Sequence, residues 1–117
     1  MVIPWKPCKI MISKISLENN QLITVPRKVI KSILVGNFVV VLTDSNEAGK
    51  LNNENVYCYD TEGNELWQIK DLNLFHEEHD YTGIYILDSS LYIYNRCGVE
   101  VKIEVETGKI LNIEFIK

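Results

Sequence analysis

The sequence has no apolar stretch that is long enough to cross a bilayer. A membrane-spanning helix needs about 18 or more mostly apolar residues, whereas the longest apolar run, at residues 33–42, is interrupted by Gly36 and Asn37. The first eight residues contain two prolines and a lysine, but neither the apolar segment nor the small-residue cleavage site of a secretory signal. We therefore expect a cytoplasmic protein that does not bind membranes.

Paired cysteines are missing too. The three cysteines, Cys8, Cys58 and Cys97, lie far apart and in no spacing that is typical of metal or redox sites. This pattern predicts free thiols, which agrees with a reducing compartment. Cys97 follows Arg96 in a predicted turn, and it is the one candidate for a reactive thiol because a neighbouring cation favours the thiolate.

Motifs of catalysis and of phosphate binding are absent. The sequence contains no Gly-x-Ser-x-Gly elbow, no cysteine with an evident histidine partner and no glycine-rich phosphate loop. The six glycines fall in predicted turns. We expect no catalytic residue and no cofactor, and a protein that is not an enzyme.

Two segments approach metal-binding patterns without completing them. His76 and His79 have acidic neighbours, but they lack the His-Glu-x-x-His spacing, and the sequence marks no third ligand. Residues 44–55 begin like a calcium loop, yet Ala48 occupies a ligand position and Asn55 stands where a bidentate glutamate is needed. The sequence therefore predicts no metal site, and an enzyme built on the two histidines is the least favoured reading.

Charge is distributed unevenly along the chain. The net charge is −4 at pH 7, and residues 44–80 hold ten acidic side chains against Lys50 and Lys70. Residues 1–43 show the reverse, with six basic side chains against Glu18 alone. An acidic belt disfavours nucleic acid and attracts a protein with a basic surface.

The segment 55–69 has the pattern of a β-hairpin. It joins a β-branched and aromatic run to a second apolar run through a polar turn that contains Gly63. The second run places Trp67 and Ile69 on one face, and we expect Trp67 to anchor the core. Polar turns with similar chemistry recur at residues 18–21, 36–37, 88–90 and 106–109.

The whole sequence follows this pattern and contains no convincing helix. At 117 residues it predicts a single domain. About ten strands are expected, with antiparallel pairing between neighbours in the sequence. The run 38–43 is apolar on both faces, which predicts a central strand that is covered on both sides. The expected strands are residues 9–17, 22–25, 29–35, 38–43, 56–60, 65–69, 83–87, 91–95, 99–105 and 110–116.

An internal repeat groups these strands. Residues 29–69 and 84–116 each hold two strands, a connection, and two further strands joined by a turn with an acid, a threonine and a glycine, and residues 9–25 form half a copy. The segment from Val56 to Trp67 resembles the repeat hairpin of quinoprotein-type β-propellers, with a weaker second copy at Val105–Leu111. The resemblance implies two to two-and-a-half blade-like antiparallel meanders, packed as a sandwich or a partly open barrel, and no quinone binding.

The chain also resembles small standalone bacterial proteins of unknown function. Together these patterns predict a non-catalytic module that binds a protein partner, as an immunity-like protein or a regulatory adaptor would. The contact residues are expected on the acidic connections, at Asp44, Glu47, Glu54, Glu77, Glu78 and Asp80. The alternative is a small-ligand or carbohydrate binder with a tyrosine-lined pocket, built from Tyr57, Tyr59, Tyr92 and Tyr94, with Tyr81 and Tyr85 nearby.

Overall fold

The structure is a computed structural model that describes residues 12–17, 20–47, 50–70 and 80–115. These residues form twelve strands and no helix, which confirms the all-β prediction. Accordingly, no helix in the described part of the chain is long and apolar enough to cross a membrane. The strands are β1 (Ser13–Ser16), β2 (Leu22–Val25), β3 (Val29–Val35), β4 (Phe38–Thr43), β5 (Asn46–Glu47), β6 (Lys50–Leu51), β7 (Val56–Asp60), β8 (Glu65–Gln68), β9 (Tyr81–Leu87), β10 (Ser90–Asn95), β11 (Val99–Ile103) and β12 (Ile110–Phe115).

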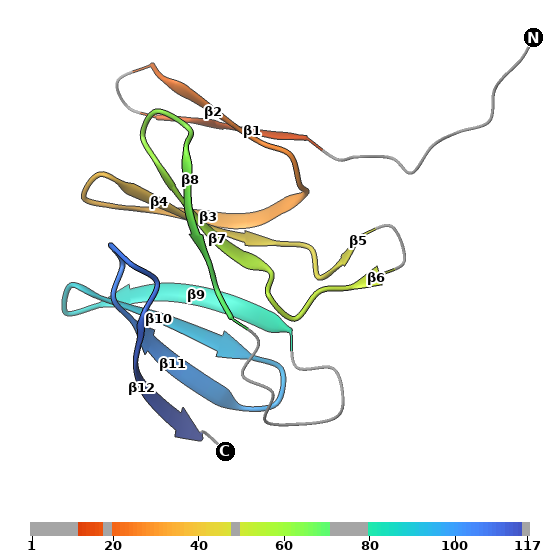
Figure 1. Ribbon diagram of the computed structural model, residues 1–117, viewed down its shortest axis with the longest axis vertical. Helices are drawn as coiled ribbons and strands as arrows, with labels where there is room; N and C mark the ends of the chain where they lie inside the picture. Colours follow the sequence, from red (N-terminus) through yellow and green to blue (C-terminus); the bar gives the residue numbers. More distant parts are fainter. Residues whose placement is uncertain (1–11, 18–19, 48–49, 71–79, 116–117) are drawn as a thin grey trace, which may run out of the picture.

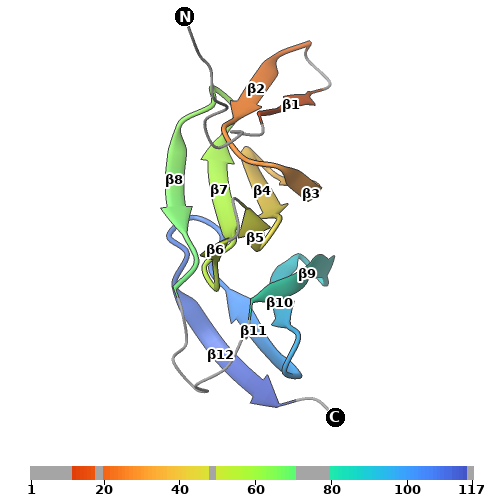
Figure 2. The same ribbon diagram turned by 90° about the vertical axis from the view of Figure 1, so that its right-hand side faces the viewer.

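Two four-stranded antiparallel sheets dominate the fold (Figure 1). One has the order β3-β4-β7-β8 and the other the order β9-β10-β11-β12, so each sheet follows the chain from one edge to the other. The hairpin β1–β2 forms a separate pair, and the sheets do not close into a barrel. Figure 2 shows the hairpin, the first sheet and the second sheet following one another along the molecule.

Predicted turns connect these strands. Gly36 has φ +60° and joins β3 to β4, and Gly63 has φ +92° in the turn between β7 and β8. Both angles lie in the left-handed region that only glycine adopts at no steric cost. The connection 44–55, which was predicted as an open loop, instead contains the two-residue pair β5–β6. Its strands are too short to leave a periodic signal in the sequence.

Strand β4 lies at the centre of the packing, as predicted. Val40 and Leu42 point to one face and join the core between the two four-stranded sheets. Val39 and Val41 point to the other face and join a second core that the β1–β2 hairpin covers. All four side chains are at most 3% exposed, so this strand is buried on both sides.

The second sheet is covered on only one side. Ile84, Ile93 and Val101 are cross-strand partners on its inner face, and each is buried in the core between the sheets. The outer face carries the alternate positions, and their cross-strand rows are Gly83, Tyr94, Glu100, Glu114 and Tyr85, Tyr92, Lys102, Asn112. Because side chains alternate along each strand, the same strands supply a buried core and an accessible polar and aromatic face.

Candidate functional site

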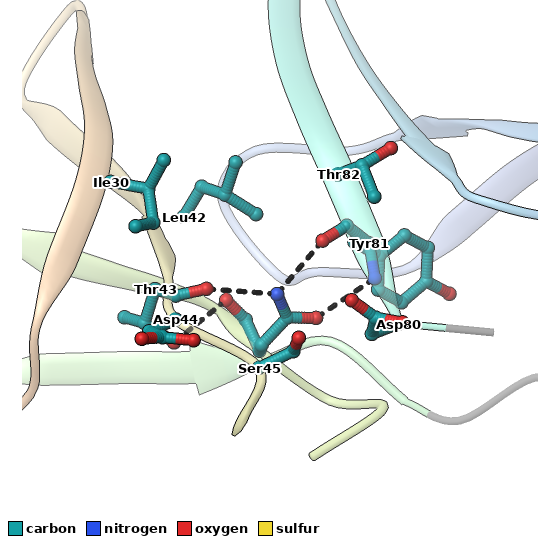
Figure 3. Close-up of a pocket in the computed structure, with 9 residues that line it drawn as sticks. Ile30, Leu42, Thr43, Asp44, Ser45, Asp80, Tyr81 and Thr82 are labelled. Carbon is teal, nitrogen blue, oxygen red and sulfur yellow. Dashed lines mark hydrogen bonds between the residues drawn. The ribbon is translucent and has the colours of Figure 1, made fainter. Parts of the chain in front are cut away.

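A pocket of about 210 Å³ lies where the two four-stranded sheets meet (Figure 3). Its walls include Asp44 and Asp80, two of the acidic residues that were predicted to bind a partner. The remaining lining residues are Ile30, Leu42, Thr43, Ser45, Asn55, Tyr81 and Thr82. The structure therefore brings together two acids that are 36 positions apart in the sequence.

Asn55 lines this pocket and joins the two sheets. Its side-chain Nδ2 donates to the carbonyl oxygens of Thr43 and Tyr81, both at 2.9 Å. Its Oδ1 accepts the backbone N–H of Tyr81, also at 2.9 Å. Asn55 is 1% exposed, and a buried amide with these partners holds the end of β4 against the start of β9.

Asp80 is committed to an ion pair with Arg96. Arg96 donates from Nε to Oδ1 at 2.7 Å and from Nη2 to Oδ2 at 3.1 Å, in a bidentate arrangement. Burial alone would raise the pKa of Asp80, but the hydrogen bonds from Arg96 and Ser45 and the charge of Arg96 outweigh it and leave the pKa lowered. The Asp80 side chain is 3% exposed, so its assignment as an accessible partner-binding residue is wrong.

The other predicted acids occupy varied positions. Asp44 is half-buried, and its Oδ2 lies 3.9 Å from the ammonium of Lys28. Glu54 is half-buried, and its carbonyl accepts a hydrogen bond from Gln68. Glu47 lies in β5, while Glu77 and Glu78 fall outside the described residues, as do His76 and His79. The volume of the pocket is below the roughly 300 Å³ of ordinary ligand sites. Its polar groups also bind one another. The residues around it therefore hold the two sheets together rather than forming a ligand site.

The four tyrosines that were predicted to line a ligand pocket, Tyr57, Tyr59, Tyr92 and Tyr94, lie in two different places. Tyr57 and Tyr59 are each 3% exposed and belong to the core beneath the β1–β2 hairpin, which corrects their assignment to an accessible ligand face. The guanidinium of Arg27 lies 3.8 Å from the ring centroid of Tyr57 and donates to the Tyr59 hydroxyl at 2.9 Å. These two tyrosines therefore serve packing. The pocket between the sheets has Tyr81 as its one tyrosine, and two further pockets in the described part of the chain, of about 250 and 420 Å³, have none.

Tyr92 and Tyr94 lie on the outer face of the second sheet, together with Tyr85. The rings of Tyr85 and Tyr92 stack at 5.3 Å between centroids and 16° between planes. The ring of Tyr94 is tilted against Tyr85 at 6.2 Å and is 40% exposed. A Cβ atom added to Gly83 would lie only 1.9 Å from the Tyr94 ring, so this ring rests directly on the glycine backbone.

Carboxylates border these rings. The hydroxyl of Tyr85 donates a hydrogen bond to Oε1 of Glu100, across strand β10. This bond, with burial and the negative charge of Glu100, raises the pKa of Tyr85 to about 12. Glu114 is the cross-strand partner of Glu100, and Lys102 and Asn112 complete the adjacent row. We call the set Tyr85, Tyr92, Tyr94, Glu100 and Glu114 the tyrosine face.

The sequence reasoning missed Gly83, Glu100 and Glu114 as members of this surface. The signal was the alternation within residues 83–85, 92–94, 100–102 and 112–114, which places these residues on one side once the strands pair in order. The described residues contain no group of three or more histidine, cysteine, aspartate or glutamate side chains that could hold a metal ion. Cys58 is buried and its pKa is raised to about 12, mainly by burial, whereas Cys97 is exposed.

A model of a protein family matches almost the whole of this fold. It covers residues 9–115 and carries the description "domain of unknown function (DUF7957)". The chain belongs to this family. No curated protein matches the sequence. The family description names no ligand or reaction, so a function for this member has to be argued from its own surfaces.

Proposed function

We propose that the chain is a non-catalytic module that binds a protein partner through the tyrosine face. The observation that carries this proposal is the exposed ring of Tyr94 on Gly83, beside the stacked pair Tyr85 and Tyr92. Tyrosine is enriched in protein interfaces because it offers a large contact area and a hydroxyl while it has few rotatable bonds. This part of the surface is the outer face of a sheet, and such a broad face suits a protein better than a small ligand.

The charge of the face favours a partner with a basic side chain. Glu100 and Glu114 are direct cross-strand partners, and like charges in such positions repel each other. An arginine or lysine of a partner would relieve this repulsion, and it would also meet the negative π surface of Tyr94. Lys102 lies in the adjacent row and reduces the local charge without cancelling it. The acidic connections around Asp44 and Glu54 would add long-range attraction, which mainly raises the association rate.

Site-specific photo-crosslinking in the organism that encodes the chain tests this proposal. Tyr94 is replaced by a photoreactive phenylalanine analogue, which keeps a ring at the position. The control places the same analogue at Thr24, which is exposed on β2. We expect a discrete protein adduct from position 94 and none from position 24.

A charge variant then tests the chemistry of the partner. Replacing Glu100 and Glu114 by glutamine keeps the side-chain size and removes both charges, so the adduct at position 94 should fall several-fold. In a lysate, the adduct of the chain that keeps both glutamates should weaken as salt rises. An adduct that forms equally at both positions, or only from positions on the acidic connections, would contradict the proposal.

A carbohydrate binder is the second candidate, and the partial exposure of Tyr94 (40%) supports it. A flat aromatic ring with nearby carboxylate and amide groups can stack on a sugar ring and bind its hydroxyls. In that case the chain would bind immobilised glycans, Tyr94→Ala would abolish the binding, and no protein adduct would form. The glycan measurement therefore separates the two candidates.

A further inference from the structure

Strand β12 is a free edge with an unusual amount of exposed apolar surface. It is the last strand of its sheet, and no described strand pairs with its outer side (Figure 1). Leu111, Ile113 and Phe115 are 51%, 40% and 66% exposed. An edge strand presents unpaired backbone donors and acceptors, and proteins usually protect such an edge with lysine, proline or a cover. Residues 110–115 contain neither lysine nor proline.

The opposite edge of the same sheet is protected. Strand β9 packs against β3 of the first sheet, and the ammonium of Lys31 donates to the carbonyl of Ile84 at 2.9 Å. A charged side chain therefore occupies a backbone acceptor on that edge. Among the described strands of this sheet, the contrast leaves β12 as the edge that is available for pairing.

We propose that β12 pairs with β12 of a second copy of this chain, in antiparallel orientation around a two-fold axis at Ile113. An axis normal to the sheet keeps equivalent residues on the same side in both copies, so one residue must face its own copy. With Ile113 at the axis, Leu111 faces Phe115 of the second copy. Asn112 then faces Glu114 of the second copy. Every apolar side chain meets an apolar one, and each carboxylate meets an amide.

Other registers of the same pair are less complementary. An axis at Glu114 would place two carboxylates opposite each other, which is destabilising. An axis at Asn112 would place Ile110 opposite Glu114 and Phe115 opposite Lys109, so two apolar side chains would face charged ones. Of these three registers, the one around Ile113 is therefore the most self-complementary. The resulting sheet of eight strands would carry two copies of the tyrosine face on one side.

The expected dimer is reversible. A contact through one strand pair is smaller than the roughly 1,200–2,000 Å² of standard stable interfaces, so a dissociation constant in the micromolar range, about 10⁻⁶–10⁻⁴ M, is expected. Sedimentation and light scattering of the full chain over this concentration range should show a mass that rises from 13.5 kDa to twice that value. Ile113→Lys should keep the chain monomeric throughout. Leu22→Lys, on an exposed apolar residue of β2 (56% exposed), is the matched control and should dimerise like the wild type.

Crosslinking tests the register. In a background in which Cys8 and Cys97 are serine, Ile113→Cys should form a disulfide-linked dimer under mild oxidation, whereas Asn112→Cys should do so at least several-fold less, because it does not face its own copy. Circular dichroism of each variant checks that the fold is retained. A chain that stays monomeric at the highest concentration, a dimer that Ile113→Lys leaves intact, or an open-ended series of larger species would overturn the proposal.

Discussion

The indole Nε1 of Trp67 donates a hydrogen bond of 2.7 Å to the backbone carbonyl of Val105, 38 residues further along the chain. Trp67 belongs to β8 at the edge of the first sheet, and Val105 belongs to the connection between β11 and β12 of the second. The ring is 8% exposed and packs against the backbone of Gly108 in the same connection. One side chain thus joins the last strand of one sheet to the last turn of the other.

Truncation of this side chain should destabilise the whole fold. Trp67→Ala removes a buried ring and its hydrogen bond, and we expect a loss of about 3–5 kcal/mol in the free energy of unfolding. Trp67→Phe keeps a ring and should cost less. Leu66→Ala, at a neighbouring residue that is 42% exposed, is the control and should change stability by less than about 1 kcal/mol. Urea denaturation followed by circular dichroism measures all three, and an unchanged midpoint for Trp67→Ala would show that the ring is not part of the core.

The contact between Trp67 and Gly108 predicts that two glycine substitutions differ in cost. Gly108 has φ +78°, and an added Cβ would approach the Trp67 ring to 2.6 Å. Gly63 has φ +92°, but an added Cβ there would meet no atom within 4 Å. Gly63→Ala should therefore cost only the backbone strain, about 1–2 kcal/mol. Gly108→Ala should cost clearly more, since the ring must also shift. Equal losses in thermal or urea denaturation would refute the role of the contact.

Much of the fold was predictable because it depends on local chemistry. Turn residues such as Gly36 and Gly63 and the runs between them determined where most strands begin and end. The apolar run of β4 predicted burial on both faces, and the structure confirms it. Two four-stranded sheets are present, each in chain order. The likeness to propeller blades stays a prediction.

The candidate site was less predictable because it depends on how the layers stack. Tyr57 and Tyr92 each belong to a strand with a second tyrosine two positions later, so their sequence patterns are alike. However, the β1–β2 hairpin covers Tyr57, while Tyr92 lies on an outer face. The sequence does not say which sheet face receives a cover. Likewise, Asp80 and Arg96 are 16 residues apart in the sequence, and their ion pair forms only when β9 and β10 pair. A count of acidic residues cannot distinguish such a buried pair from accessible charge.

The ion pair between Asp80 and Arg96 should make the folding stability depend on pH in the acidic range. The pKa of Asp80 is lowered in the folded state, so its contribution is complete above the unfolded value of about 4 and is lost as pH falls through the folded pKa. Arg96→Met removes the cation that pairs with this buried carboxylate and leaves it the hydrogen bond from Ser45, and it should cost about 1.5–3 kcal/mol at pH 7. Below the lowered pKa of folded Asp80, where the carboxyl is protonated in the native state as well, wild type and variant should converge. A difference that is constant from pH 7 to pH 3 would contradict this origin.

The bond between Tyr85 and Glu100 should be visible in an alkaline titration. The pKa of Tyr85 is raised to about 12 because the Glu100 carboxylate accepts a hydrogen bond from the Tyr85 hydroxyl and opposes a second negative charge. The pKa of Tyr85 is higher in the folded state than the unfolded value of about 10. The bond between Tyr85 and Glu100 therefore stabilises the fold fully below pH 10, and this contribution is lost as pH rises towards 12. Ultraviolet absorbance at a tyrosinate wavelength, as the difference between wild type and Tyr85→Phe, isolates this hydroxyl from the other tyrosines.

Glu100→Gln keeps an acceptor but removes the charge, so the transition should move down towards pH 10. Glu114→Gln removes a charge from the same row without touching the hydrogen bond, and it should shift the transition far less. Equal shifts in the two variants would show that the net charge of the face, and not the direct bond, controls Tyr85.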